Sequence, residues 1–494
     1  MSQTVEDVNA GKLAGGAEFQ PGHLGMKTQH LKLLLAILGP GLVAMLADAD
    51  VGSVITAAQS GAQWGYKLLS LQVLMIPVLY VVQELTVRLG IFTGKGHGEL
   101  IRETFGWGWA WLSVAGLAVA CLGALVTEFA GISGVGLLFG VPQVTSLTLA
   151  VTVLLVVVWT GSYQRVERIA IFLGLFELAF VWVAIRAPVQ GHELMSGLVT
   201  LPVHHRQYWY LVSANIGAVI MPWMVFYQQS AVTDKKLKPD QYTYSRWDTA
   251  IGAVLTQVVM VAVLVAAAAT LGKTHAQTPL DTVGQIAQAL TPALGVKFGH
   301  IVFGLGILGG AMVSAIVVSL AMSWGFCEVT GYSHSLGNHP LEAPWFYGIF
   351  SVGVIGSAFV VLLVPNLVTL SVAVQVMNAF LLPLVLGFLV ALAVKALPLE
   401  HRLRGAYFWV VLGVVVVTCV LGIYGGLIPF RYQRGSNIQV RPASRIKAAG
   451  LFANTLSPIS ALATTASKDS NTRLAKVFSR SSSQTCSSGF RSGQ

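Results

Sequence analysis

Charged side chains are scarce in this sequence. Only 10% of its 494 residues are Asp, Glu, Lys or Arg, whereas 55% are hydrophobic, and the mean hydropathy is +0.71. A soluble domain carries about 25% charged residues, so this composition cannot cover a surface that faces water. The scarcity excludes a soluble protein and indicates an all-α integral membrane protein that crosses the bilayer several times.

Cysteine and several catalytic motifs are also missing or rare. The four cysteines form no CxxC pair, which excludes a disulfide framework and a cysteine-based zinc site. The first 30 residues lack the short apolar run of a cleavable signal peptide. No GxxxxGK[ST] motif occurs, so ATP-driven transport is disfavoured. The eleven histidines lie in the N-terminal segment, in loops or at span edges, which argues against an intramembrane enzyme; we expect no resident cofactor.

The formal net charge of +10 is located almost entirely in the C-terminal tail. After residue 427 the sequence holds ten Lys or Arg and one acid, Asp469. The Ser-rich composition of 428–494 predicts a disordered tail. It is either an extension without structural role or a patch that binds anionic lipid headgroups. Because the body is nearly neutral, the charge gives no reason to expect nucleic-acid binding.

Long apolar runs account for most of the remaining chain. A run of 18 or more residues predicts a membrane-spanning helix, because about 20 residues cross the hydrocarbon core. This rule predicts eleven spans, at 33–57, 67–93, 109–139, 146–161, 166–187, 209–231, 247–272, 299–328, 345–364, 367–395 and 406–427.

The loops between these spans predict the orientation. Lys and Arg gather in the loops after spans 2, 4, 6 and 10, so the positive-inside rule places the N-terminal segment 1–30 in the cytoplasm, most simply at the cell membrane. An odd number of spans then puts the basic tail outside. Its length weakens this conflict, because long tails cross membranes largely regardless of charge.

The first span contains two acids at membrane depth. The stretch "GPGLVAMLADADVGSV" places Asp48 and Asp50 in mid-span, together with Gly52 and Ser53. Each buried Asp costs about 2.5–3.5 kcal/mol on insertion scales. A bound cation or a proton would offset that cost.

The sixth span contains a helix breaker at the same depth. Met221-Pro222 lies in "NIGAVIMPWMVFYQQSAV", and proline frees carbonyls near Ala218 from the helical ladder. Breaks in spans 1 and 6 are expected of two inverted five-span repeats, the LeuT-like arrangement, whose unwound segments meet at the bilayer midplane. A carboxylate, free carbonyls and the thioether of Met221 would form a mixed site that favours Mn²⁺ or Fe²⁺, whereas oxygen ligands alone suit Mg²⁺ or Ca²⁺.

Three stretches carry a resemblance to a known family. Over about residues 30–427 the chain resembles the Nramp family of proton-coupled divalent metal transporters, through "GPGLVAMLADADVGSVITAAQSGAQWGYKLL", "RLGIFTGKGHGELIRE" and "GAVIMPWMVFYQQSA". The resemblance implies that Asp50 and Met221 are metal ligands, that Ala47 and Ala218 supply backbone carbonyls, and that Ser53 occupies the position of a ligating Asn.

The chain departs from the family pattern at other positions. The two span-6 histidines that the family uses for proton handling are replaced by Trp223 and Gln228, as in the divergent branch that includes magnesium transporters. These changes leave open both the identity of the ion and its coupling to protons.

Further polar residues at membrane depth are candidates for accessory roles. Glu128 is a candidate for the proton pathway, with a helix-to-helix hydrogen bond as the alternative. Asp48 and Gln228 are interpreted as residues near the site or in the proton pathway. Gln375 and Asn378 lie where the family places a Gln that completes the occluded ion site.

Four other residues at membrane depth are interpreted as structural. They are Glu84 with Arg88, Glu177 and Glu328.

The leading hypothesis is a secondary active importer of divalent metal ions, of the Mn²⁺ or Fe²⁺ type and coupled to protons; a monomer would suffice. Mg²⁺ uptake without proton coupling is the alternative, and an ion channel is the alternative of another class. The expected transporter domain covers 31–427, with repeats at about 33–187 and 209–395 and an extra helix at 406–427.

Overall fold

The computed structural model describes residues 39–271, 280, 282–290, 295–364 and 367–433. No strand occurs among these residues. Helices are the expected outcome, because lipid offers no hydrogen-bond partner and a helix satisfies its own backbone. The segment 1–30, the start of the first predicted span and residues 434–494 of the predicted tail lie outside the described residues.

The first half of the chain forms a series of helices with two short 3₁₀ turns. They are α2 (Pro40–Asp48), α3 (Val51–Trp64), η1 (Gly65–Leu68), α4 (Leu69–Thr93), α5 (His97–Phe105), α6 (Trp107–Leu138), α7 (Gln143–Trp159), α8 (Tyr163–Gly174), η2 (Leu175–Glu177), α9 (Leu178–Arg186) and α10 (Gly191–Val199).

The second half continues the same pattern. Its elements are α11 (Arg206–Val219), α12 (Pro222–Asp234), η3 (Pro239–Gln241), α13 (Tyr242–Leu271), α14 (Val283–Leu290), α15 (Val296–Thr330), α16 (Pro344–Val361), α17 (Leu367–Lys395) and α18 (Gly405–Gln433). Helix α18 continues to Gln433 and so includes the first six residues of the predicted tail.

Nine helical runs of the described residues are long and apolar enough to cross a membrane, whereas eleven spans were predicted. The difference has two local causes. The run Val51–Thr93 joins α3, η1 and α4, although Gly65, with φ +60°, ends α3 and separates it from α4. Helix α7 has 17 residues and falls just below the length of a full span.

The two predicted helix breaks are both present. The first predicted span is divided between α2 and α3 at Ala49-Asp50, and the sixth between α11 and α12 at Ile220-Met221. Three short helices, α5, α10 and α14, were not predicted, because each is too short to give a span-length apolar run.

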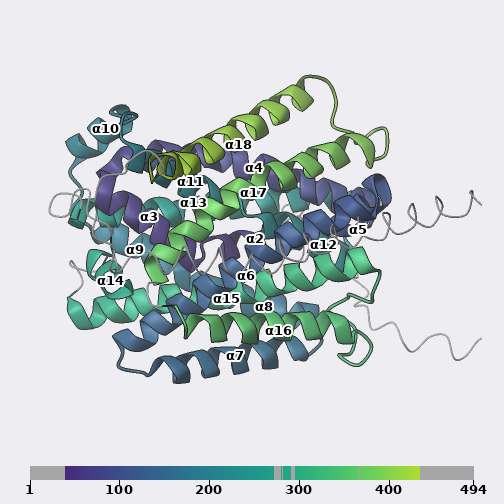
Figure 1. Ribbon diagram of the computed structural model, residues 1–494, viewed down its shortest axis with the longest axis horizontal. Helices are drawn as coiled ribbons and strands as arrows, with labels where there is room; N and C mark the ends of the chain where they lie inside the picture. Colours follow the sequence, from purple (N-terminus) through teal and green to yellow (C-terminus); the bar gives the residue numbers. More distant parts are fainter. Residues whose placement is uncertain (1–38, 272–279, 281, 291–294, 365–366, 434–494) are drawn as a thin grey trace, which may run out of the picture. The chain divides into compact units, whose positions relative to one another are not determined.

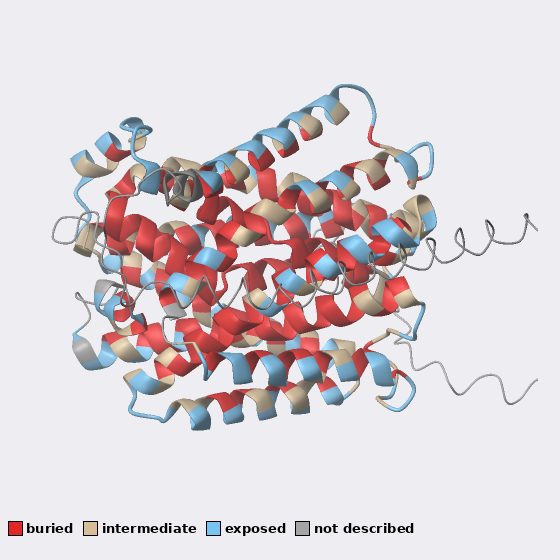
Figure 2. Ribbon diagram, in the orientation of Figure 1, coloured by how far each residue is buried: buried red, intermediate tan, exposed pale blue. Residues whose placement is uncertain are grey.

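The divided helices lie in the interior of the helix array (Figure 1). Helix α13 packs against α2, α3 and α4, while α15 packs against α6, α16 and α8. Helices α7 and α16 lie side by side at one edge and α18 at the opposite edge (Figure 1). Burial follows this order: α2, α3, α11 and α12 are buried along almost their whole length, whereas α7 and α18 are largely exposed on one face (Figure 2).

Candidate functional site

The break between α2 and α3 is organised by Asp50. Its backbone is extended, with φ −64° and ψ 171°, and it caps α3 by accepting a hydrogen bond from the Ser53 amide on Oδ1 at 2.6 Å. Aspartate is among the preferred N-cap residues, which explains why the helix restarts here. The side chain has 0% exposure and its Oδ2 has no hydrogen-bond partner. One carboxylate oxygen is therefore free for a ligand.

The break between α11 and α12 is organised by Pro222. Proline stands at the first position of α12, and Met221 is the extended N-cap residue, with φ −97° and ψ 141°. In a continuous helix the amide of residue 222 would bond to the Ala218 carbonyl, but proline has no N–H. The Ala218 carbonyl is thus released, as the sequence predicted.

A hydrogen bond joins the two breaks. The Ser53 hydroxyl at the start of α3 donates to the released Ala218 carbonyl at 3.0 Å. Ser53 and Ala218 are 1% and 4% exposed, so this contact lies in the interior. It brings Asp50 and Met221, which are far apart in sequence, into one region of the molecule.

The carbonyl of Ala47 is released in a comparable way. The Val51 amide, which would bond to Ala47 in a continuous helix, donates instead to Glu128 Oε2 on α6 at 3.3 Å. The other oxygen of Glu128, Oε1, has no partner. Glu128 therefore contacts the backbone of the break directly.

The sulfur of Met221 is not free of contacts. The indole Nε1 of Trp223 donates to Met221 Sδ at 3.1 Å, and both side chains are completely buried. A buried indole N–H needs an acceptor, and thioether sulfur is a weak one. Trp223 therefore fixes the orientation of the Met221 side chain, and one lone pair of the sulfur accepts the indole hydrogen bond.

Gln375 on α17 lies close to the same region. A methyl group added to Gly52 would lie 2.2 Å from Gln375 Nε2, so the amide packs directly over the start of α3. Gln375 Oε1 accepts from Asn378 Nδ2 at 3.0 Å, while Gln375 Nε2 and Asn378 Oδ1 have no partner. Gln375 lies beside the break, and Asn378 supports it.

Asp48 and Gln228 are less central. Asp48 is the last residue of α2 rather than part of an unwound segment, and its Oδ1 has no partner. Gln228 donates to Thr249 Oγ1 on α13 at 2.9 Å, and no hydrogen bond joins it to Asp50 or Met221. Its observed contact is a link between α12 and α13.

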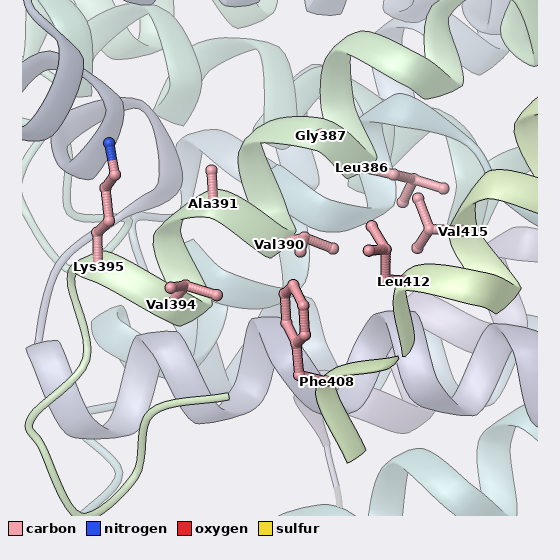
Figure 3. Close-up of a pocket in the computed structure, with 9 residues that line it drawn as sticks. All are labelled: Leu386, Gly387, Val390, Ala391, Val394, Lys395, Phe408, Leu412 and Val415. Atoms are coloured by element: carbon pink, nitrogen blue, oxygen red, sulfur yellow. The ribbon is translucent and has the colours of Figure 1, made fainter. Parts of the chain in front are cut away.

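A metal ion here would need backbone and sulfur ligands. Within the described residues, no three His, Cys, Asp or Glu side chains lie close enough together to hold a metal ion. The candidate set is instead one carboxylate oxygen, two released carbonyls, a hydroxyl and a thioether. A cavity of about 310 Å³ between α17 and α18 (Figure 3) contributes nothing to this set, because its lining is apolar apart from Lys395.

Sequence reasoning missed Asp248. This buried acid of α13 accepts hydrogen bonds from the amides of Gly41 at 2.8 Å, Leu42 at 3.2 Å and Gly39 at 3.4 Å. It caps the beginning of α2 from another helix. An acid near the start of a predicted span could have been noted, but its partner depends on tertiary packing.

His97 lies between two spans, as expected, but its burial was not foreseen. It begins α5, is fully buried, and contacts Gln229 Oε1 through Nδ1 at 2.9 Å. Burial lowers its pKa from 6.5 to about 4, and the hydrogen bond with Gln229 offsets only part of this effect. His97 is therefore neutral near pH 7.

The chain is similar in sequence to known proteins. The model of the Nramp family, "Natural resistance-associated macrophage protein-like", matches residues 41–427. A divalent metal cation transporter MntH of Erwinia tasmaniensis is 28% identical over 310 residues, which cover 61% of this chain and 74% of the relative.

Solved structures show the same fold. A manganese transporter of Eremococcus coleocola aligns with a TM-score of 0.68 at 19% identity, covering 91% of this chain and 95% of that one. MhsT in complex with L-phenylalanine aligns with a TM-score of 0.56 at 14% identity, covering 79% and 98%. At these identities the likeness concerns the fold alone, which is all-helical and LeuT-like.

Proposed function

Because this chain belongs to the Nramp family of integral, multi-pass membrane proteins, we propose that it is a secondary active transporter that imports divalent metal ions. We further propose that the ions are of the Mn²⁺ or Fe²⁺ type and that protons are the coupled ion. The metal is substrate, not a resident cofactor. The relatives support this choice, since one is named a divalent metal cation transporter and another a manganese transporter.

The hydrogen bond between Ser53 Oγ and the Ala218 carbonyl is the observation that carries this proposal. It joins two helix breaks that have released their carbonyls, and beside it Asp50 Oδ2 has no partner although it is completely buried. An unpaired buried carboxylate is expensive unless a cation or a proton accompanies it.

The donor atoms support selectivity for a borderline metal. Asp50 Oδ2, the carbonyls of Ala47 and Ala218 and the hydroxyl of Ser53 are hard ligands, whereas Met221 Sδ is soft. Mg²⁺ binds oxygen and keeps much of its water, so a thioether adds little to its affinity. First-row ions such as Mn²⁺ and Fe²⁺ accept both ligand types.

Release of the ion requires movement. Asp50 and Met221 have 0% exposure, so neither side chain is in contact with water. We propose that α2, α3, α4, α11, α12 and α13, which pack on one another, rock against the remaining helices. In this proposal the chain crosses the membrane eleven times as two inverted five-span halves plus α18, with its N-terminus in the cytoplasm, and it can work as a monomer.

Proton coupling would arise at the acids beside the ion. A carboxylate must be ionised to bind a metal, so binding at Asp50 expels any proton that it holds. Glu128, whose Oε1 is unpaired, is the proposed acceptor of protons near the break. Gln228 cannot titrate, and we assign it a positioning role.

Uptake into proteoliposomes with a pH-sensing dye inside tests this function. We expect Mn²⁺ to enter and to acidify the lumen, and Mg²⁺ and Ca²⁺ in excess to compete poorly. Strong competition by Mg²⁺ without acidification would instead support magnesium uptake without proton coupling. Metal flux that no proton gradient can drive uphill would support a channel.

Replacement of the sulfur tests the ligand set. Met221→Ala should weaken Mn²⁺ uptake relative to Mg²⁺ by about tenfold, the effect of losing roughly 1.4 kcal/mol of ligand interaction. Met224→Ala is the matched control, because Met224 is also fully buried in α12 but lies beyond the break. An unchanged Mn²⁺ to Mg²⁺ ratio in Met221→Ala would remove Met221 from the site.

A further inference from the structure

A second group of unpaired oxygen atoms lies where the end of α2 meets η2 and α15. Glu177 is the last residue of η2, the 3₁₀ turn that separates α8 from α9 within one apolar run. It is completely buried, and neither of its carboxylate oxygens has a hydrogen-bond partner. A 3₁₀ turn inside a membrane helix often marks a functional position.

The carbonyl of Ala49 faces the same place. The Ser53 amide, which would bond to Ala49 in a continuous helix, donates to Asp50 instead. A methyl group added to Gly310 of α15 would lie 3.1 Å from the Ala49 carbonyl oxygen and 3.1 Å from Glu177 Oε1. The two oxygens therefore border one small space, which the missing side chain of Gly310 leaves open.

A second acid lies near this space. Asp48, with its unpaired Oδ1, directly precedes Ala49. Glu177 interacts electrostatically with Asp50 and, after it, with Asp48. Among the described residues, no Lys, Arg or His forms an ion pair with Asp48 or Glu177.

Two acids that share a buried region without a positive partner must bind either protons or a cation. The unpaired atoms here are all oxygen, with no sulfur or nitrogen, unlike the set around Asp50 and Met221. All-oxygen ligand sets favour hard cations. We propose that Glu177, Asp48 and the Ala49 carbonyl form a second cation site, for a hard ion such as Na⁺, Mg²⁺ or Ca²⁺.

This site goes beyond the proposed function and would act on the helix α2 that ends just before Asp50. Asp48 and Ala49 belong to the end of α2, whereas Glu177 and Gly310 belong to η2 and α15, which pack on α8, α6 and α16. A cation bound between them ties α2 to these neighbouring helices. The bound cation would stabilise the conformation in which the end of α2 lies against η2 and α15, because a ligand favours the state that binds it more tightly.

Thermal unfolding of the full chain in detergent tests the second site. The midpoint Tm is measured in choline chloride and then with NaCl, MgCl₂ or CaCl₂ at constant ionic strength, and separately with MnCl₂. A ligand that binds the folded state raises Tm. We expect at least one hard cation to raise the Tm of the wild type, and Glu177→Gln to lose this rise while keeping the rise with Mn²⁺.

Two further variants separate the sites. Asp50→Asn should keep the rise with the hard cation and lose the rise with Mn²⁺. Gly310→Ala should lose the hard-cation rise, because its methyl group fills the space between the two oxygens, and it serves as the second variant if Glu177→Gln does not fold. Gly356→Ala in α16 is the control, since a methyl group there meets nothing within 4 Å.

The outcomes are distinguishable. The second site is overturned if the wild type responds to none of the three cations, if its Tm depends only on pH, or if Glu177→Gln and Gly310→Ala keep the full response. Loss of the hard-cation response in both variants supports the site even if Mn²⁺ has no effect on the wild type, a result that would count against the proposed function alone.

Discussion

Two sets of buried or half-buried acids differ in their hydrogen bonding in this protein. The central acids, Asp48, Asp50, Glu128 and Glu177, surround the break between α2 and α3, and each has at least one carboxylate oxygen without a hydrogen-bond partner. The paired acids, Glu84, Glu167, Asp248 and Glu328, lie on α4, α8, α13 and α15, and none of their oxygens is left buried and unpartnered.

The paired acids hold helices together. Glu84 binds Arg88 at 2.7 Å and accepts hydrogen bonds from Tyr242 and Tyr407, which confirms the predicted i,i+4 ion pair. Glu167 binds Lys235 at 2.8 Å. Glu328 accepts from Ser230 and from the Gly98 amide.

The contrast separates architecture from function. In a buried acid that is fully hydrogen-bonded, fixed partners offset the free-energy cost of removing the carboxylate from water. The charge of an acid with unpaired oxygens must instead be compensated by a cation or a proton that binds reversibly. Removing a central acid should therefore change ion binding, whereas removing a paired acid should change stability.

The largest expected effect is on transport. Asp50→Asn should reduce Mn²⁺ uptake in proteoliposomes to the level of empty vesicles, because the charged ligand is lost. Its Tm without metal should not fall, since Asn also caps helices and the unpaired charge disappears. Asp240→Asn in the exposed η3 turn is the control. Full transport by Asp50→Asn would contradict the claim that the central acids bind ions whereas the paired acids stabilise the fold.

His97, which like the paired acids has a fixed hydrogen-bond partner, should make stability depend on pH. His97 has a folded pKa of about 4 against 6.5 for an exposed histidine, so between these values the unfolded chain binds more protons. The stabilisation is present above pH 6.5 and is lost as pH falls to 4, by about 3 kcal/mol. Unfolding of the wild type and of His97→Gln across this range measures it. An equal loss in both proteins would contradict the prediction.

Loss of a paired acid should cost stability. Asp248→Ala leaves three amides at the start of α2 without their acceptor, and we expect about 2 kcal/mol of destabilisation. Asp248→Asn, which keeps one acceptor oxygen, should lose less. Chemical or thermal unfolding without metal gives both values. If neither variant is destabilised, the cap does not hold α2.

The smallest expected effect is on selectivity. Trp223→Phe removes the indole N–H that donates to Met221 Sδ and should make the sulfur a better ligand. Uptake of the softer ion Cd²⁺ relative to Mn²⁺ should rise about fivefold, the equivalent of one hydrogen bond of roughly 1 kcal/mol. Trp324→Phe is the control, because its buried indole N–H makes no hydrogen bond. An unchanged ratio would show that the indole only fills space.

Several features followed from the sequence because their causes are local. Long apolar runs specify membrane helices, and Pro222 removes a hydrogen bond wherever it stands. Acids at membrane depth in the first span and Pro222 in the sixth predicted both breaks. The number of spans was harder to predict, because η1 joins two helices and α7 is short.

The partners of the polar groups required the tertiary structure. Glu177 was interpreted as a structural acid like Glu84, yet Glu84 has an arginine one turn away and Glu177 has no hydrogen-bond partner. From the sequence, Trp223 was interpreted only as the replacement of a family histidine, although its indole N–H donates to Met221 Sδ.

The sequence by itself determined that this chain lies in a membrane, that its first and sixth spans are interrupted, and which residues stand at the interruptions. Those properties depend on hydropathy and on backbone chemistry within a few residues. Only the tertiary structure decided which buried acids are paired and which are left open to a cation. Pairing depends on atoms of different helices that come within hydrogen-bond distance, such as those of Glu167 and Lys235, 68 residues apart, or Asp248 and Gly41, 207 residues apart.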